Sequence, residues 1–72
     1  MSDSETLVIE AIRKLGGYSR FVTIQEVEAS TNLDKTALEK TLINLDKQGL
    51  LGHVGVRHDS AVHAKIPTIF KL

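Results

Sequence analysis

The hydrophobic pattern of this chain changes its period at Gly49, and this change restricts the class of fold more than any other feature. Before Gly49, apolar residues recur three or four positions apart, which is the spacing of an amphipathic helix. After it, two sets of side chains alternate from Leu50 to Arg57, which is the spacing of a strand. The sequence therefore predicts an α+β fold with three helices and a two- or three-stranded antiparallel sheet.

The size of the chain leaves room for one domain, residues 1–72. A chain this short buries only about 60% of its unfolded surface, so its stability depends on good local structure or on a partner. It has no cysteine, which excludes disulfide bonds and thiolate metal sites. No apolar run approaches the roughly 20 residues that span a bilayer, and the acidic start lacks the basic region of a signal peptide. We expect a cytoplasmic protein with no membrane partner.

The first predicted helix runs from Ser4 to Leu15. Ser2 and Glu5 have the spacing of a capping box at its start, and the pair Gly16–Gly17 ends it. Ile9 is expected to point away from the apolar stripe, where it could contact a second copy in a homodimer. The stripe itself consists of Leu7, Val8, Ala11, Ile12 and Leu15.

A short strand and a short helix follow. Residues 21–23 favour a strand, and a second helix is predicted from Ile24 to about Ser30. Thr23 and Glu26 have the spacing of another capping box at the start of that helix. Asn32 lies in the turn that follows, where its side chain suits a left-handed backbone.

The third predicted helix runs from Lys35 to Gln48, with Asp34 as its N-cap and Gly49 as its stop. At 100° per residue, its core face is formed by Leu38, Thr41, Leu42 and Leu45. The opposite face is formed by Thr36, Lys40, Ile43, Asn44 and Lys47.

Charge is balanced over the whole chain, with nine basic and nine acidic residues. Binding to nucleic acid would therefore depend on the local distribution of charge. Glu39 and Asp46 lie on one flank of the third helix, and their negative charges are expected to weaken binding to phosphate. Glu39 stands four residues after Lys35, so we expect these two side chains to form an ion pair.

A β-hairpin is predicted for the rest of the chain. Its first strand runs from Leu50 to Arg57, its turn from His58 to Ala64, and its closing strand from Ile66 to Leu72. Pro67 cannot donate to a ladder, so the closing strand is expected at an edge of the sheet or irregular near its start. One face of that strand should carry Ile66, Thr68, Phe70 and Leu72.

This order of elements resembles the winged helix-turn-helix family. The resemblance is carried by residues 33–38 and 42–51, where the third helix ends in the pattern Leu-x-x-x-Gly-hydrophobic, from Leu45 to Leu50. It implies a small DNA-binding transcriptional regulator with helix 35–48 in the major groove and the 51–71 hairpin as the wing.

The closing segment from Ile66 to Leu72 is also similar to the proline-containing wing strand of Zα-type domains, which bind left-handed nucleic acid. In that family the recognition helix carries an Asn and a Tyr, and the corresponding positions here are Glu39 and Ile43. Lys40 matches a basic position of the family, while Phe70 stands where the family has Trp. The loss of the Asn and the Tyr removes the main reason to infer binding of the Z form.

The winged-helix resemblance and the helix faces together define the predicted double-stranded DNA contacts. Lysines suit phosphate or guanine, asparagine suits adenine edges, and isoleucine suits a thymine methyl group. The predicted contacts on the third helix are Lys35, Thr36, Lys40, Ile43, Asn44 and Lys47. The predicted contacts on the wing are Arg57, His58, His63 and Lys65.

Other functions have less support in the sequence. His53, His58 and His63 recur every five residues, but without further ligands they do not predict a metal site, and no cofactor is expected. Their charge changes near neutral pH, which could make wing affinity pH-dependent. No catalytic constellation or phosphate-binding loop is present, so an enzyme is not predicted. The neutral charge favours the alternative, a winged-helix module that binds a protein partner without binding DNA.

Overall fold

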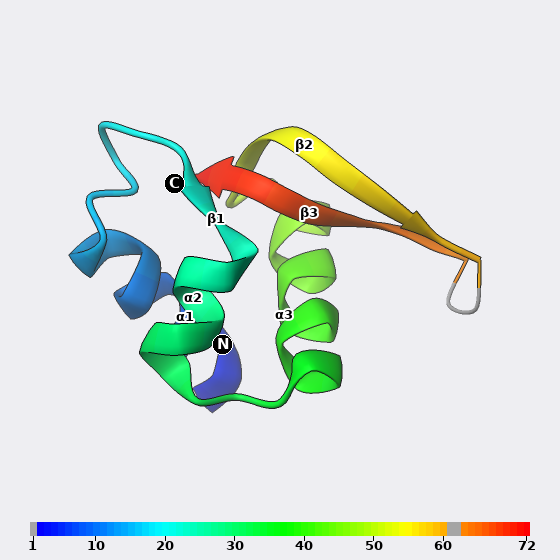
Figure 1. The fold of residues 1–72 in the computed structure, drawn as a ribbon, viewed down its shortest axis with the longest axis horizontal. Helices are drawn as coiled ribbons and strands as arrows, with labels where there is room; N and C mark the ends of the chain where they lie inside the picture. The colour runs from blue at the N-terminus through cyan, green and yellow to red at the C-terminus, as the bar shows by residue number, and fades with distance from the viewer. Residues whose placement is uncertain (1, 61–62) are drawn as a thin grey trace.

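The structure is a computed structural model that describes residues 2–60 and 63–72. Within those residues, three helices and a three-stranded antiparallel sheet form the expected α+β fold. The elements are, in order, α1 (Asp3–Lys14), β1 (Val22–Thr23), α2 (Ile24–Thr31), α3 (Lys35–Lys47), β2 (Gly52–Asp59) and β3 (Ala64–Lys71). The helices lie on one side of the sheet, and the β2–β3 hairpin extends past α3 (Figure 1). No helix in the described part of the chain is long and apolar enough to cross a membrane.

Local side chains start each helix as the sequence predicts. Ser2 and Glu5 form a reciprocal capping box on α1, and Thr23 and Glu26 form the same arrangement on α2. The Asp34 carboxylate accepts a hydrogen bond of 2.8 Å from the backbone N–H of residue 37 and caps α3. A cap of this kind contributes about 0.5–2 kcal/mol, which matters in so small a protein.

The ends of the helices also follow the predicted turn chemistry. Asn32 ends α2 in the left-handed conformation with φ of 57°, and Gly49 follows α3 with φ of 73°. Both values lie in the region that disfavours most side chains. The bounds shift by a residue: α1 begins at Asp3 and ends at Lys14, and Gln48 caps α3 instead of continuing it.

The sheet has the strand order β1-β3-β2. β1 pairs with β3 through Val22 and Thr23, which lie opposite Phe70 and Ile69. β2 pairs with β3 over its full length, and the register shifts between His53 and residue 56. The closing strand of the chain is therefore the central strand of the sheet.

Of the two alternatives expected for the strand of Pro67, this position excludes an edge strand, while the register shift between the pairs Gly55–Ile69 and Val56–Pro67 agrees with an irregular strand. β1 has two residues and ends opposite Ile69, so it does not reach Pro67. Pro67 lies opposite Val56 of β2 and is fully buried. Proline is tolerated at this point of a central strand because β1 has no residue opposite Pro67 that would need a hydrogen bond from its missing N–H.

The hairpin is longer than predicted at its far end. β2 begins at Gly52 instead of Leu50 but continues to Asp59, and β3 begins at Ala64. The predicted turn, residues 58–64, therefore shrinks, and its residues 61 and 62 lie outside the described residues. His58 and Lys65 belong to paired strands and not to the turn.

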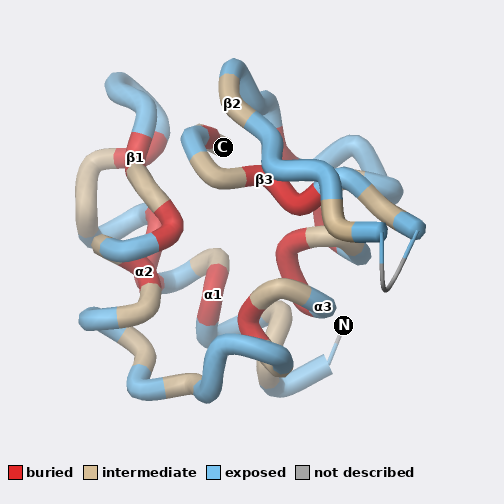
Figure 2. Tube along the Cα trace, turned by 45° about the vertical axis from the view of Figure 1, so that its right-hand side comes forward, coloured by how far each residue is buried: buried red, intermediate tan, exposed pale blue. Residues whose placement is uncertain are grey.

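The core lies between the three helices and the inner face of β3. Figure 2 shows buried stretches of the helices and of β3 turned toward the middle of the molecule, with β2 largely exposed. The predicted core faces of α3 and β3 are confirmed by this arrangement. The buried hydrophobic residues are Val8, Ala11, Ile12, Val22, Ile24, Val27, Leu38, Leu42, Leu45, Leu51, Ile66 and Phe70.

Three apolar residues differ from their predicted positions. Leu7 was expected in the core but is 42% exposed. Ile9 and Ile43 were expected to point away from the core, yet both are half-buried and pack against it. Each sits on a helix with two packed neighbours: α1 lies against α2 and α3, and α3 lies against α1 and β3. A helix that packs against two neighbours buries residues on two sides, and not only on one apolar face.

Candidate nucleic-acid interface

The outer face of α3 carries polar and basic side chains that are open to solvent. Thr36, Lys40, Asn44 and Lys47 follow one another three or four residues apart and share this face, and each is exposed. Lys35 is exposed at the start of the same helix. In residues 2–60 and 63–72, none of these three lysines forms an ion pair. The face is therefore available to an anionic partner.

Ile43 is placed differently from the other predicted contacts on α3. It packs against the core and is half-buried, so a large part of its side chain is already covered by the protein. This half-burial leaves less of its surface for a thymine methyl group than the sequence suggested.

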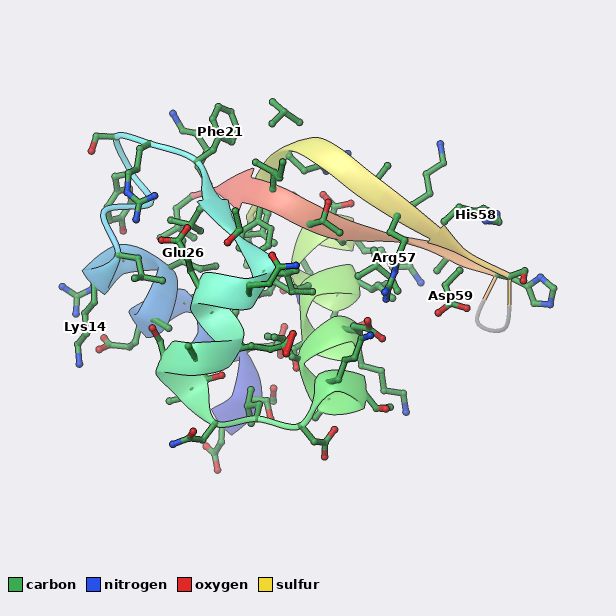
Figure 3. The ribbon with its side chains drawn as sticks, in the orientation of Figure 1. Lys14, Phe21, Glu26, Arg57, His58 and Asp59 are labelled. Carbon is green, nitrogen blue, oxygen red and sulfur yellow. The ribbon has the colours of Figure 1, made fainter. Side chains whose placement is uncertain are left out.

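The wing residue Arg57 is turned toward α3. Its guanidinium donates a hydrogen bond to the Glu39 carboxylate, and the two form an ion pair. Figure 3 shows Arg57 pointing from β2 toward the helix. The expected Lys35–Glu39 pair is therefore wrong, because Arg57 lies opposite Ile66 on the inner face of the sheet and reaches Glu39 first. The Glu39 side chain is 16% exposed and the Arg57 side chain 45%, so the pair is only partly shielded from solvent.

A second contact joins the same two elements. The Nδ1 atom of His53 lies 2.9 Å from Oδ1 of Asp46. A carboxylate can only accept, so Nδ1 carries the hydrogen and donates it. His53 lies opposite the buried Phe70, which places it on the inner face of the sheet.

The two contacts match in spacing, so α3 and β2 are joined at two points. Glu39 and Asp46 are seven residues apart on α3, a rise of about 10 Å. Arg57 and His53 are four residues apart on β2, a rise of about 13 Å. The helix and the strand run in opposite directions between the contacts. We call these two contacts, Glu39–Arg57 and Asp46–His53, the α3–β2 rungs.

The rungs change the charge of this side of the molecule. Glu39 and Asp46 were expected to oppose phosphate, but each is bound to a basic group of β2. The lysines of α3 have no such partner among the described residues. The Arg57 guanidinium offsets the charge of Glu39, whereas His53 offsets that of Asp46 only when its imidazole is protonated. With three unpaired lysines among the described residues, this face is still more basic than the whole chain, whose net charge is zero.

The far end of the hairpin supplies the remaining predicted contacts. His58 lies opposite Lys65, so both side chains project from the same face of the hairpin, and both are exposed. His63 is exposed in the turn, with a left-handed φ of 50°. Figure 3 shows His58 near the hairpin tip, far from the helices. These groups form a second area, separate from α3.

The three histidines do not converge. His53 is bound to Asp46 at the base of the hairpin, while His58 and His63 lie toward its tip. Within the described ranges, no group of three or more His, Cys, Asp or Glu side chains could hold a metal ion. The regular five-residue spacing thus reflects no common site in this part of the structure.

Two glutamates away from this face have pKa values below their ordinary range. The pKa of Glu26 is lowered first by a hydrogen bond from the Arg20 guanidinium, 2.9 Å away, and then by the backbone N–H of Thr23. The pKa of Glu5 is lowered first by the backbone N–H of Ser2, then by the Gln48 side chain. Both carboxylates hold the starts of helices, so they belong to the scaffold.

The sequence contained a signal for the rungs that its helix-by-helix interpretation missed. Two acids seven residues apart lie on one side of a helix, and two basic groups four residues apart lie on one side of a strand. The pairing of these two sets depends on how the hairpin folds back on α3. No protein-family model, curated protein or solved structure matches this chain. Its function must be inferred from the geometry of this face.

Proposed function

We propose that this chain is a small DNA-binding protein of the winged helix-turn-helix type, acting as a transcriptional regulator. In this proposal α3 enters the major groove and the β2–β3 hairpin is the wing. The supporting observation is the charge on the α3 face: its lysines are unpaired within the described residues, while its acids are bound by β2. Such a face attracts phosphate although the whole chain is neutral.

The outer face of α3 suits the dimensions of the major groove. The helix has 13 residues, a length of about 20 Å, and the groove admits an α-helix. Lys40 and Lys47 would contact phosphate or guanine, and Asn44 would contact adenine. Lys35 and Thr36 lie in the first turn, the part of a recognition helix that contacts base edges most often.

The hairpin would make the second contact. Lys65 and His58 project together near its tip and would reach the phosphate backbone. Such contacts fix the position of a protein on the duplex and carry little sequence information. Arg57 would act indirectly, because its guanidinium is engaged by Glu39.

Titration with duplex DNA tests this proposal. Amide shifts would be followed at two salt concentrations, with a fluorescence measurement of affinity. We expect shifts confined to α3 and the hairpin, and an affinity that falls steeply as salt rises, by roughly 0.9 log units per log unit of salt for each phosphate contact. An absence of binding at low salt would refute the DNA-binding proposal.

Charge-matched variants test the assignment of the face. The double variant Lys40→Ala, Lys47→Ala should bind more weakly and with a smaller salt slope. For each lysine variant made singly, Lys71→Ala is the charge-matched control, because it also removes one positive charge and Lys71 lies over the Phe21 ring, 5.7 Å from its centroid, away from α3. An unchanged affinity in the double variant would mean that DNA binds another face.

A second candidate function is a protein-interaction module, favoured by the outer face of the sheet. Phe21, Val54, Val56 and Ile69 are exposed there, and large apolar side chains left in solvent are typical of protein contacts. In the DNA titration, this module would show no salt-dependent binding and no shifts on α3. The same experiment therefore separates the two functions.

A further inference from the structure

A groove on the helical side of the molecule takes no part in the proposed function. It lies between α1 and the end of α2 and has a volume of about 280 Å³. Its lining residues are Leu7, Glu10, Ala11, Lys14, Leu15 and Ser30. Five of these six side chains come from α1 and its C-cap, so the groove follows one face of a single helix.

The floor and walls of the groove are apolar. Leu7, Ala11 and Leu15 follow one another four residues apart and form a line along the helix. Ala11 is buried at the middle of this line, whereas Leu7 is 42% exposed and Leu15 is half-buried. A small residue between two leucines leaves space for another helix to approach closely.

The rim of the groove carries one acidic and one basic side chain, one turn apart. The Glu10 carboxylate accepts hydrogen bonds of 3.1 and 3.2 Å from the Arg13 guanidinium. Lys14 is exposed and has no ion pair within residues 2–60 and 63–72. A helix that docks here would place a charged group near Lys14, and a carboxylate would complete its pairing.

We propose that the occupant of this groove is α1 of a second copy of the chain, in an antiparallel arrangement about a two-fold axis near Ala11. Residues equidistant from Ala11 then meet, so Leu7 of each copy packs against Leu15 of the other. Glu10 and Lys14 lie one and three residues from Ala11, so across the axis they are offset by about 3 Å along the helix, a distance that their long side chains span. Glu10 of each copy then comes within reach of Lys14 of the other, and the contact occurs twice. This self-complementary order of charge is what a two-fold interface requires.

The location of the groove allows this dimer to form without covering the candidate nucleic-acid interface. Figure 3 shows Lys14 at the end of the molecule opposite the hairpin, and the longest dimension of the molecule is 31 Å. Two copies joined through α1 would each keep α3 and the hairpin uncovered. The inference does not rest on DNA binding, and its test contains no DNA.

Sedimentation equilibrium of the full chain, from about 10 µM to 1 mM, tests the proposal over the range of weak dimers. We expect a monomer–dimer equilibrium, and Leu7→Glu should raise its dissociation constant at least about tenfold, because a charge would enter the apolar contact. Leu50→Glu is the matched control, since Leu50 is 40% exposed, close to the 42% of Leu7, and lies outside the groove. A monomer at every concentration, or equal effects of the two variants, would overturn the proposal.

A charge swap tests the antiparallel register. Lys14→Glu alone should weaken the dimer about two- to tenfold, since it places like charges opposite each other twice. Adding Glu10→Lys should restore most of the affinity, because the pairs then re-form with reversed sign. Circular dichroism checks that α1 stays helical in each variant. A double variant no tighter than the single variant would show that Glu10 and Lys14 do not meet across the interface.

Discussion

Both faces of the sheet carry large apolar side chains, but the two faces differ in how far these side chains are buried. On the inner face, Val22, Ile66 and Phe70 are buried against the helices. On the outer face, apolar side chains such as Ile69 and Val54 remain 40% and 66% exposed. Neighbouring positions of one strand, 69 and 70, thus differ completely in burial.

The difference shows that the position of an apolar residue along the strand decides its burial where β3 crosses β1, at residues 69 and 70, whereas Ile66 and Pro67 are both buried nearer its start. β3 supplies large apolar groups to the inner face, while β2 supplies polar groups that bind α3. The inner face is therefore both the floor of the core and the anchor of the hairpin. The apolar side chains of the outer face are 40–66% exposed, so we expect them to contribute less to stability than those of the inner face.

The largest expected effect comes from truncating one residue on each face. Phe70→Ala should lower the free energy of unfolding by about 3–5 kcal/mol, because Phe70 is fully buried and leaves a cavity. Ile69→Ala, on the outer face, should lower it by about 1 kcal/mol or less. Urea denaturation of both variants measures the contrast. Similar losses at the two positions would contradict the comparison.

A smaller effect is expected from the rungs at the edge of the inner face. Glu39→Gln removes the ion pair with Arg57 and should lower the free energy of unfolding by about 1 kcal/mol or less, because the Arg57 side chain is largely in solvent. If the DNA-binding proposal holds, the variant should also bind DNA more tightly, because a negative charge is lost and Arg57 is released. Urea denaturation and the DNA titration measure these opposite effects. Weaker DNA binding would show that the rung itself positions the hairpin.

Gly55 offers a finer test of how loosely the outer face is packed. A Cβ atom at this position would lie 3.2 Å from Cδ1 of Ile69. Cδ1 of Ile69 can turn away because the side chain is partly exposed, but its Cβ, 3.3 Å from the added atom, is fixed to the backbone, so Gly55→Ala should lower the free energy of unfolding by about 1 kcal/mol or less. Thermal denaturation of the variant measures the change. A loss several times larger would mean that the outer face is packed as firmly as the inner one.

The smallest effect concerns pH, at the junction of the outer face with α2. Glu26 binds Thr23 and Arg20, and its pKa lies below the ordinary value of 4.5. A lowered pKa in the folded state gives stability that is present above pH 4.5 and is lost as the pH falls through the lowered value. The melting temperature of Glu26→Gln should therefore depend less on pH in this acidic range than that of the parent chain. Equal pH profiles would assign the acid sensitivity to other carboxylates.

The sequence predicted the parts of the fold that depend on neighbouring residues. Caps such as Ser2 and Asp34, the left-handed Asn32 and the core face of α3 all follow from spacing within one element. These features need no knowledge of what packs against them. Their agreement with the structure is the expected result for a chain whose local signals are consistent.

The predictions that were wrong depend on a neighbouring element that lies elsewhere in the sequence. Ile9 and Ile43 are half-buried because their helices have two neighbours, which a single helical wheel does not show. The strand of Pro67 is central because it pairs with both β1 and β2, and proline is tolerated in it because β1 ends before reaching it. Glu39 pairs with Arg57, 18 residues away, instead of Lys35. At the candidate site, sequence located the basic side chains but not the partners of the acids between them.

The α3–β2 rungs have a consequence for the entropy of binding. Two points of contact on each element restrict the motion of the hairpin relative to the helix before any partner arrives. Less ordering is then needed in the complex, which favours affinity without adding a contact. The distance between the two basic areas is also fixed in advance. If the DNA-binding proposal holds, a duplex that meets both areas would have to adapt its groove width or its bend to the protein, and sequences that deform easily would bind best.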